Sequence, residues 1–510
     1  MARKAIIQGT NLITMFFVSL VACAQKGPDA TVSLPDTACS IHGAMKIIEN
    51  RTGFRFSYNS DLFDDSKMCR LEAGSRSVTG IIGELIPDPG IRFRIISNQI
   101  VLYRPDLRII EKNSSGRDTT KSWLFIRGTL LDASSKDPVP YASIGLIGKN
   151  SGSISNLSGH FLLKTGTESI EDSIGVWSLG YQNYMAPVFS LIGKDNTIYL
   201  SPEYISIQEV IIRKTDPVAL VSTALDRIPQ NYPVRATGQT AFYRETIQKN
   251  KQYVEVSEAI LDIYKPSYIA ESERERVRII RGRKGTDPEL KDTVSLKLKA
   301  GLNTSLILDV VRNRPDFLNK ETMDHYWYRM SDVVMKGNRT TYAIDFIQRE
   351  ETLPPHYQGR IFIDAESLAI TDVDFEIVPG KIGQATGYLV LRKPRGMSVR
   401  ALSASYHASY EKTGHLYFLR LIRSENRFRT RYKGQLFGST YSARSELAVN
   451  DIDTTDVIRF RRRESARVGD AFSDLIEGTD LSFWDPYNII VPDEPLEKAM
   501  ARFRMSAGEE

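Results

Sequence analysis

Apolar residues between positions 30 and 104 recur first at helical and then at strand spacing. Four of them share one face of a helix that ends at Gly53, namely Ile41, Ala44, Met45 and Ile48. Four more predict a second helix, namely Val78, Ile81, Ile82 and Leu85. Alternating segments at residues 31–34, 54–58, 69–73, 91–96 and 99–103 are typical of short strands. The pattern predicts a small domain of order βαββαββ at residues 30–104, and the turn-rich residues 105–121 predict a linker.

Short apolar segments separated by Gly, Pro, Asn and Ser occupy residues 122–200. The strands that they predict are residues 125–131, 142–147, 160–163 and 173–177. Because no helical period occurs between them, this region is expected to be a small β-sandwich. Gly159 is expected to supply the positive φ of a tight turn before the third of these strands.

The region from residue 215 to 510 begins with a helix and continues mainly as strands. Asp216-Pro217 is a favourable N-cap and first-turn pair, and an apolar helical face follows as far as Ile228. Alternating segments then predict an antiparallel sheet from residues 240–246, 253–264, 342–346, 359–364, 368–377, 387–391, 404–410, 416–423 and 437–449. A last helix is expected at residues 495–503. The predicted fold class is therefore α+β and multidomain: a small βαββαββ domain, a β-sandwich, and a large mainly antiparallel β domain with a few helices.

The first 24 residues have the organisation of a secretory signal peptide. A basic start precedes an apolar run, Leu12 to Ala22, that is too short to span a bilayer. Two processing routes fit the residues that follow: lipidation of Cys23 in a lipoprotein box, or cleavage that frees Gln25. No later stretch reaches 18 consecutive apolar residues, so we expect an exported chain without a membrane-spanning helix.

Cys39 and Cys69 are the two cysteines beyond this leader. In an oxidising compartment an even pair is expected to form a disulfide, because no Cys-x-x-Cys motif or nearby histidine suggests a metal site. The other interpretation is two free thiols buried as small apolar side chains.

Composition and motif spacing give no indication of nucleic-acid binding or of catalysis. The 510 residues carry 67 Lys and Arg against 62 Asp and Glu, and aromatic residues do not gather beside basic stretches. None of the six histidines begins a His-x-x-Glu or His-Glu-x-x-His motif of zinc hydrolases. Asp324-His325 and His356 lack a companion nucleophile or ligand at diagnostic spacing. We therefore expect no enzyme activity, no metal and no cofactor.

The densest basic run consists of five arginines, Arg274, Arg276, Arg278, Arg281 and Arg283. If residues 277–280 form a strand, the first three share one face and are suited to contact lipid phosphates or an acidic partner. Glutamates interleave with these arginines, so the second interpretation is a solvated strand face balanced by its own carboxylates.

The first domain resembles the secretin and TonB short N-terminal (STN) domain. The phrases KIIENRTGFRFSYNSDLF and SVTGIIGELIPDPGIRFRIISNQIVLY carry this resemblance, together with the order of the elements. The resemblance implies a periplasmic protein-interaction module at the outer membrane.

The second domain resembles the carboxypeptidase-regulatory-like (carboxypeptidase D regulatory-like) domain. This rests on the phrases IRGTLLDASSKDPVPYASIGLIGKNSGSISNLSGHFLLKTG and SIGVWSLGYQNY. Later phrases, among them YVEVSEAILDIYKPSY and FWDPYNIIVPDEPLEKAM, resemble the C-terminal region of Gram-negative envelope proteins that also carry such a domain. That region brings no known activity with it.

Together these features predict a non-enzymatic cell-envelope protein, located in the periplasm or at the periplasmic face of the outer membrane. It is expected to act as a protein-interaction or accessory module by surface complementarity. The expected partner is an envelope protein, which the STN resemblance suggests is a component of a TonB-dependent transport system, with peripheral contact to the outer membrane. Two alternatives are open: a carrier that shelters a lipid in the concave face of the C-terminal sheet, and a hydrolase with an unrecognised site in that domain.

Overall fold

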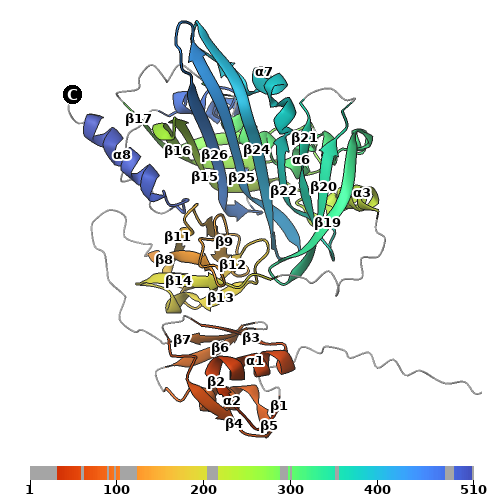
Figure 1. Ribbon diagram of the computed structural model, residues 1–510, viewed down its shortest axis with the longest axis vertical. Coiled ribbons are helices and arrows are strands. Elements are labelled where there is room, and N and C mark those ends of the chain that lie inside the picture. Colours follow the sequence, from red (N-terminus) through yellow and green to blue (C-terminus); the bar gives the residue numbers. More distant parts are fainter. Residues whose placement is uncertain are drawn as a thin grey trace, which may run out of the picture. The chain divides into compact units, whose positions relative to one another are not determined.

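The computed structural model describes residues 31–58, 62–88, 91–96, 99–103, 123–203, 216–270, 272–287, 297–298, 301–350, 355–455, 457–476 and 487–507 (Figure 1). The predicted signal peptide, Cys23 and the predicted linker lie outside these residues. The chain divides into two compact units, one that ends at Leu102 and one that continues from Tyr103.

The first unit is a small α+β domain built from two helices and short strands. Its elements are β1 (Thr31–Leu34), β2 (Thr37–Ser40), α1 (Ile41–Thr52), β3 (Arg55–Ser57), β4 (Met68–Leu71), β5 (Gly74–Ser77), α2 (Val78–Leu85), β6 (Arg92–Ile96) and β7 (Gln99–Tyr103). The predicted helices and strands are present, and β2 and β5 are additional. The side chain of Ser40 caps α1 by accepting from Gly43 N at 3.1 Å, and Gly53 ends the helix with a φ of 77°.

The second unit begins with a β-sandwich of two small sheets. Its strands are β8 (Trp123–Asp132), β9 (Ser143–Leu146), β10 (Gly152–Ile154), β11 (His160–Gly166), β12 (Ser173–Trp177), β13 (Tyr184–Pro187) and β14 (Asp195–Leu200), in the orders β10-β9-β12-β13 and β11-β8-β14. Gly159 has the expected positive φ of 75°, and a Cβ there would lie 2.4 Å from the carbonyl oxygen of Leu130. Glycine is therefore required at this turn.

The rest of the second unit is a ten-stranded antiparallel sheet with short helices. The strands are β15 (Thr237–Lys249), β16 (Gln252–Lys265), β17 (Arg276–Thr286), β19 (Tyr326–Lys336), β20 (Arg339–Gln348), β21 (Tyr357–Asp364), β22 (Ile370–Ile377), β24 (Met397–Thr413), β25 (Leu416–Tyr432) and β26 (Ser439–Asp453). They pair in the order β17-β16-β15-β26-β25-β24-β22-β21-β20-β19. The helices are α3 (Pro217–Asp226), α4 (Ile228–Asn231), α5 (Leu302–Ile307), α6 (Val310–Asn313), α7 (Thr386–Leu389) and α8 (Glu494–Ala507), and β18 (Lys297–Leu298) pairs with β23 (Val390–Arg392).

The predicted fold class is confirmed, and the local differences include the unpredicted sandwich strands β10, β13 and β14 and two regions of the large domain. Residues 387–391 were expected as a strand, but α7 and the short β23 occupy them, because β22 pairs directly with β24 and leaves no place in the large sheet. Strand β19 was not predicted, since Ser331 and Asp332 interrupt its apolar pattern where the pairing with β20 shifts.

The two faces of the large sheet are covered differently. One face packs against α3 to α6 in a continuous apolar core that includes Tyr232, Leu261 and Phe317. On the other face, the sandwich and residues 487–490 cover β15, β16, β25 and β26, and α8 covers β16 and β17. Ile154 of the sandwich lies in one apolar cluster with Phe242 and Ile490. The part of this second face nearer β19 is the surface that carries the candidate site.

Among the described residues, no helix is long and apolar enough to cross a membrane.

Candidate functional site

A row of ionisable side chains crosses all ten strands of the large sheet, on the face that the sandwich partly covers. We call it the charge row, and from β19 to β17 its members are Arg329, Asp345, Arg360, Asp374, His407, Arg423, Glu446, Arg244, Glu258 and Arg283. Each member is the direct cross-strand partner of the next. Since side chains directly opposite each other in an antiparallel pair are in contact range, the row forms a continuous line of charge.

The end of the charge row toward β17 is buried. Glu258 is completely buried and accepts from Arg244 Nε at 2.6 Å and from Arg283 Nε at 2.5 Å. Burial alone would raise the pKa of the Glu258 carboxyl, but the two guanidinium groups outweigh it and hold this pKa below its usual value. This end of the row joins the sheet to the segments that cover it, because Arg244 also donates to the carbonyl oxygen of Ile490 at 2.7 Å.

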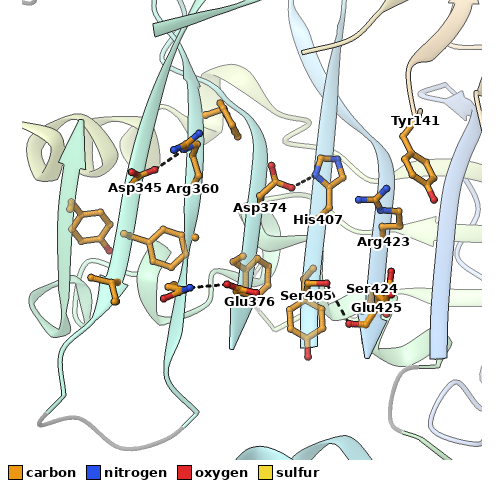
Figure 2. A pocket seen from close by; sticks show the side chains of 18 of the residues that line it. Tyr141, Asp345, Arg360, Asp374, Glu376, Ser405, His407, Arg423, Ser424 and Glu425 are labelled. Carbon is orange, nitrogen blue, oxygen red and sulfur yellow. Dashed lines mark hydrogen bonds and ion pairs between the residues drawn. The ribbon is translucent and has the colours of Figure 1, made fainter. Parts of the chain in front are cut away.

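The other end of the charge row forms the floor of a cavity of about 1010 Å³ (Figure 2). Strands β19 to β26 supply most of its lining, and the sandwich contributes Tyr141 and Leu157. The neighbouring register position of each strand also lines it, with Trp327, Ile347, Gln358, Glu376, Ser405, Glu425 and Arg444. The cavity is therefore built on adjacent strands of one sheet, and its lining is mixed, because aromatic side chains such as Phe346 and Tyr406 lie beside the charges.

Ion pairs fix most of the cavity floor. Arg360 Nε lies 2.6 Å and Arg329 Nη2 lies 3.0 Å from the carboxylate of Asp345. Burial would raise the pKa of Asp345, but the hydrogen bonds from Arg360 and Arg329 outweigh it, so this pKa is lowered and the carboxylate stays charged.

Asp374 and His407 form a hydrogen-bonded pair at the centre of the cavity. Nδ1 of His407 lies 2.7 Å from Oδ1 of Asp374. Burial opposes ionisation of Asp374, yet the hydrogen bond from His407 and the charges of Arg423 and Arg360 lower its pKa. An oriented histidine of this kind is suited to proton transfer, but no hydroxyl or thiol of the described residues is hydrogen-bonded to its other ring nitrogen. The arrangement supplies a base and an orienting group without a nucleophile.

Arg423 is the next member of the row and stacks on the sandwich. Its guanidinium carbon lies 3.9 Å from the centroid of the Tyr141 ring, and the hydroxyl of Tyr141 donates to Oε1 of Glu446 at 2.9 Å. The other carboxylate oxygen of Glu446 lies 3.6 Å from Arg244. Burial, followed by the nearby Glu446, raises the pKa of Tyr141, so the phenol keeps its proton.

The five arginines proposed from the sequence divide between exposed and buried positions. Arg274, Arg278 and Arg281 are exposed, Arg276 is half-buried, and Arg278 pairs with Asp262. Arg283 is 5% exposed, so the expectation that it belongs to a contact surface is wrong: α8 covers it, and Glu258 neutralises it. The predicted strand is present, and contact of the four others with lipid or an acidic partner stays a prediction.

The structure brings Cys39 and Cys69 together as direct partners on β2 and β4. Both are free thiols, and burial together with the neighbouring Cys39 raises the pKa of Cys69. Disulfide formation between them stays a prediction.

Two other histidines were noted in the sequence, His325 and His356. Among the residues that the structure describes, the ring of His325 pairs with the adjacent Asp324, and the buried ring of His356 has no hydrogen-bond partner. Within the described ranges, no group of three or more His, Cys, Asp or Glu side chains is arranged to hold a metal ion.

The sequence interpretation missed the charge row, because its members are single residues spread over more than 200 positions. The available signal was an ionisable residue at an outward position of each alternating segment, such as Asp345, Asp374 and His407. That signal indicates which face of each strand is polar, but it does not indicate which residues lie opposite each other on neighbouring strands.

Comparisons with known proteins identify weak structural similarity. No family model and no curated protein matches the sequence. A domain described as an outer membrane lipoprotein-sorting protein, from Vibrio parahaemolyticus, is 9% identical, with a TM-score of 0.22 over 48% of this chain and 95% of its own. A DUF1329 family protein from Desulfovibrio piger is 10% identical, with a TM-score of 0.21 over 46% and 94%. Lipovitellin is 8% identical, with a TM-score of 0.21 over 45% and 26%. These TM-scores are too low to indicate a shared fold or ligand.

Proposed function

We propose that the chain is an exported, non-enzymatic binding protein of the cell envelope, and that its cavity receives an extended polypeptide segment of a partner. The observation that carries the proposal is the cavity of about 1010 Å³ on the charge row. Pockets for small ligands measure about 300–1,000 Å³, so this cavity lies at the upper end of that range.

The dimensions of the lining suit an extended chain. It runs from β19 to β26, which are seven adjacent strands of the sheet. At about 4.8 Å between neighbouring strands, the floor extends roughly 29 Å, or about nine residues of an extended peptide at about 3.3 Å per residue.

The charges of the lining favour a peptide of mixed charge. Four arginines and four carboxylates line the cavity, namely Arg329, Arg360, Arg423, Arg444, Asp345, Asp374, Glu376 and Glu425. A polyanion or a polycation would meet as many repelling as attracting groups. The aromatic side chains beside these charges, such as Phe346 and Tyr406, suit apolar side chains of the peptide. The opposite face of the sheet is covered by apolar side chains of the chain itself, such as the fully buried Phe317.

Trp327 offers an anchor for such a peptide, because it lines the cavity and is 61% exposed. A random-peptide library displayed against the mature protein should enrich binders with a shared pattern of charges. Trp327→Ala should weaken the best binder by about tenfold or more, since aromatic anchors carry much of the binding energy. Leu436→Ala, at a position that is 89% exposed and outside the cavity, is the matched control and should change nothing.

The proposal fails if the library yields no peptide whose binding depends on the cavity. Equal loss of affinity in Trp327→Ala and Leu436→Ala would also contradict the proposal, because binding would then not depend on the cavity.

A further inference from the structure

Charges in the row alternate in sign except at one step. From Arg329 to Asp374 and again from Arg423 to Arg283, each acid lies opposite a base. Between these two stretches, two basic residues, His407 and Arg423, are direct partners. When the His407 imidazole is protonated, this step places two cations opposite each other, which is unfavourable in a sheet and which an added anion would relieve.

No ion pair joins Arg423 to an acidic side chain among the described residues. Glu446 lies opposite it on the next strand, but the two oxygens of that carboxylate contact Tyr141 and Arg244. Neither an ion pair nor a hydrogen bond links Arg423 to any described residue; its contact is the stack on Tyr141. Because stacking uses the face of the guanidinium, the N–H groups at its edge are available for a two-pronged contact with an anion.

His407 is oriented toward the same place. Asp374 is ionised and can only accept, so Nδ1 of His407 carries the proton of their 2.7 Å hydrogen bond. The second ring nitrogen then donates to an anion when the imidazole is protonated. Figure 2 shows His407 between Asp374 and Arg423, with Tyr141 beside Arg423. All four side chains line the cavity.

Tyr141 is held at this position by the sandwich. Its backbone has a φ of 58°, which is uncommon for a residue other than glycine, and its N–H donates to the carbonyl oxygen of Ser155 at 3.1 Å. This conformation places the phenol where it both occupies Glu446 and stacks on Arg423. Residues in this backbone conformation are common at functional sites, and here it accompanies the contact between the phenol ring and Arg423.

We propose that Arg423 and His407 form an anion subsite that takes a carboxylate of the bound polypeptide, from an Asp or Glu side chain or from its C-terminus. The subsite rests on the proposed function and adds a requirement to it: the partner segment must present an acidic group at this point.

The first test uses peptides enriched by the library. Each Asp or Glu of a peptide is replaced singly by Asn or Gln, and its C-terminal carboxylate is replaced by an amide. One of these replacements should lower the affinity of the peptide for the unaltered protein by about tenfold, because a charged hydrogen bond is lost. In Arg423→Gln the same replacement should have no effect. Arg429→Gln is the matched control: it alters an exposed arginine of the same strand outside the cavity and should leave the acidic preference intact.

The second test needs no peptide. Sodium acetate should shift the ¹³C resonance of the His407 ring, identified by its loss in His407→Gln, relative to sodium chloride at equal ionic strength. Arg423→Gln should weaken this response by about tenfold or more. Sodium phosphate serves as the second probe, and a response to phosphate without a response to acetate would overturn the assignment of a carboxylate.

The outcomes separate the subsite from the proposed function. Peptide binding without an acidic preference, together with no response to acetate, overturns the subsite and leaves the function. A response to acetate in a protein that binds no peptide overturns the proposed polypeptide ligand and supports the subsite. If the protein neither binds a peptide nor responds to acetate, the subsite and the proposed function are both overturned.

Discussion

The hydroxyl of Tyr141 donates a 2.9 Å hydrogen bond to the carboxylate of Glu446, a residue 305 positions further along the chain. Tyr141 belongs to the sandwich and Glu446 to the centre of the large sheet, so this bond joins the two parts of the second unit at the edge of the cavity. The same phenol ring stacks on Arg423, the arginine of the row that forms no ion pair with a described residue.

Removing this hydroxyl should have two effects. Tyr141→Phe should lower the free energy of unfolding by about 1 kcal/mol, because Glu446 loses a hydrogen bond. It should also weaken the response of His407 to acetate, since the released carboxylate oxygen can pair with Arg423. Urea denaturation and the acetate titration measure the two effects. Tyr388→Phe, at an exposed position outside the cavity, should change neither; an unaltered acetate response in Tyr141→Phe would contradict the role given to Tyr141.

The buried end of the charge row should be far more sensitive than the cavity end. Glu258→Gln leaves Arg244 and Arg283 as buried cations without their shared carboxylate, which should cost about 3 kcal/mol or more of unfolding free energy. Glu425→Gln is the matched control, because its carboxylate is 39% exposed and pairs with Arg444 at 3.1 Å. It should cost less than about 1 kcal/mol. Similar losses in the two variants, by urea denaturation, would show that burial of the row does not matter.

Acid should destabilise the second unit through its buried carboxylates. Burial opposes ionisation of Glu258 and Glu275, but their basic neighbours outweigh it, and both pKa values are lowered from the ordinary 4.5. A lowered pKa in the folded state adds stability above pH 4.5, and this contribution is lost as the pH falls through the folded value. The urea midpoint should therefore be insensitive to these groups between pH 7 and about 5 and should fall below about pH 4.5.

Glu258→Gln identifies the part of this acid sensitivity that belongs to Glu258. Its deficit relative to the unaltered protein should shrink as the pH falls, because the unaltered protein then loses the charge that the variant lacks. A deficit that stays constant down to the point of acid unfolding would show that the ionised carboxylate contributes nothing.

Cys39 and Cys69 should form a disulfide when the protein is exported. Directly opposite residues of an antiparallel pair have Cα atoms about 4.5–5.5 Å apart, within the range that a disulfide requires. The bond should add about 3 kcal/mol to the stability of the first unit. Thiol titration of the denatured protein from the periplasm should detect neither thiol, whereas protein made in the cytoplasm should titrate both. Two titratable thiols in the exported protein would contradict the prediction.

The sequence by itself determined the local structure. Helix α3 begins where Asp216 and Pro217 predict it, and the side chain of Asp216 accepts from Val218 N at 2.9 Å. Such features depend on neighbours a few residues away, as do the positive φ of Gly159 and the alternation of most strands in the large sheet. Local order was therefore predictable.

Only the tertiary structure decided which strands are neighbours and in which register they pair. Strand β15 lies beside β26, so that Arg244 meets Glu446, because burying the apolar face fixes that pairing over 200 positions. A register shift at Ile280 then turns Arg281 and Arg283 to the same face as Arg276 and Arg278. A shift by a single residue would move every side chain of a strand to the opposite face, so no local pattern could have assembled the charge row or its cavity.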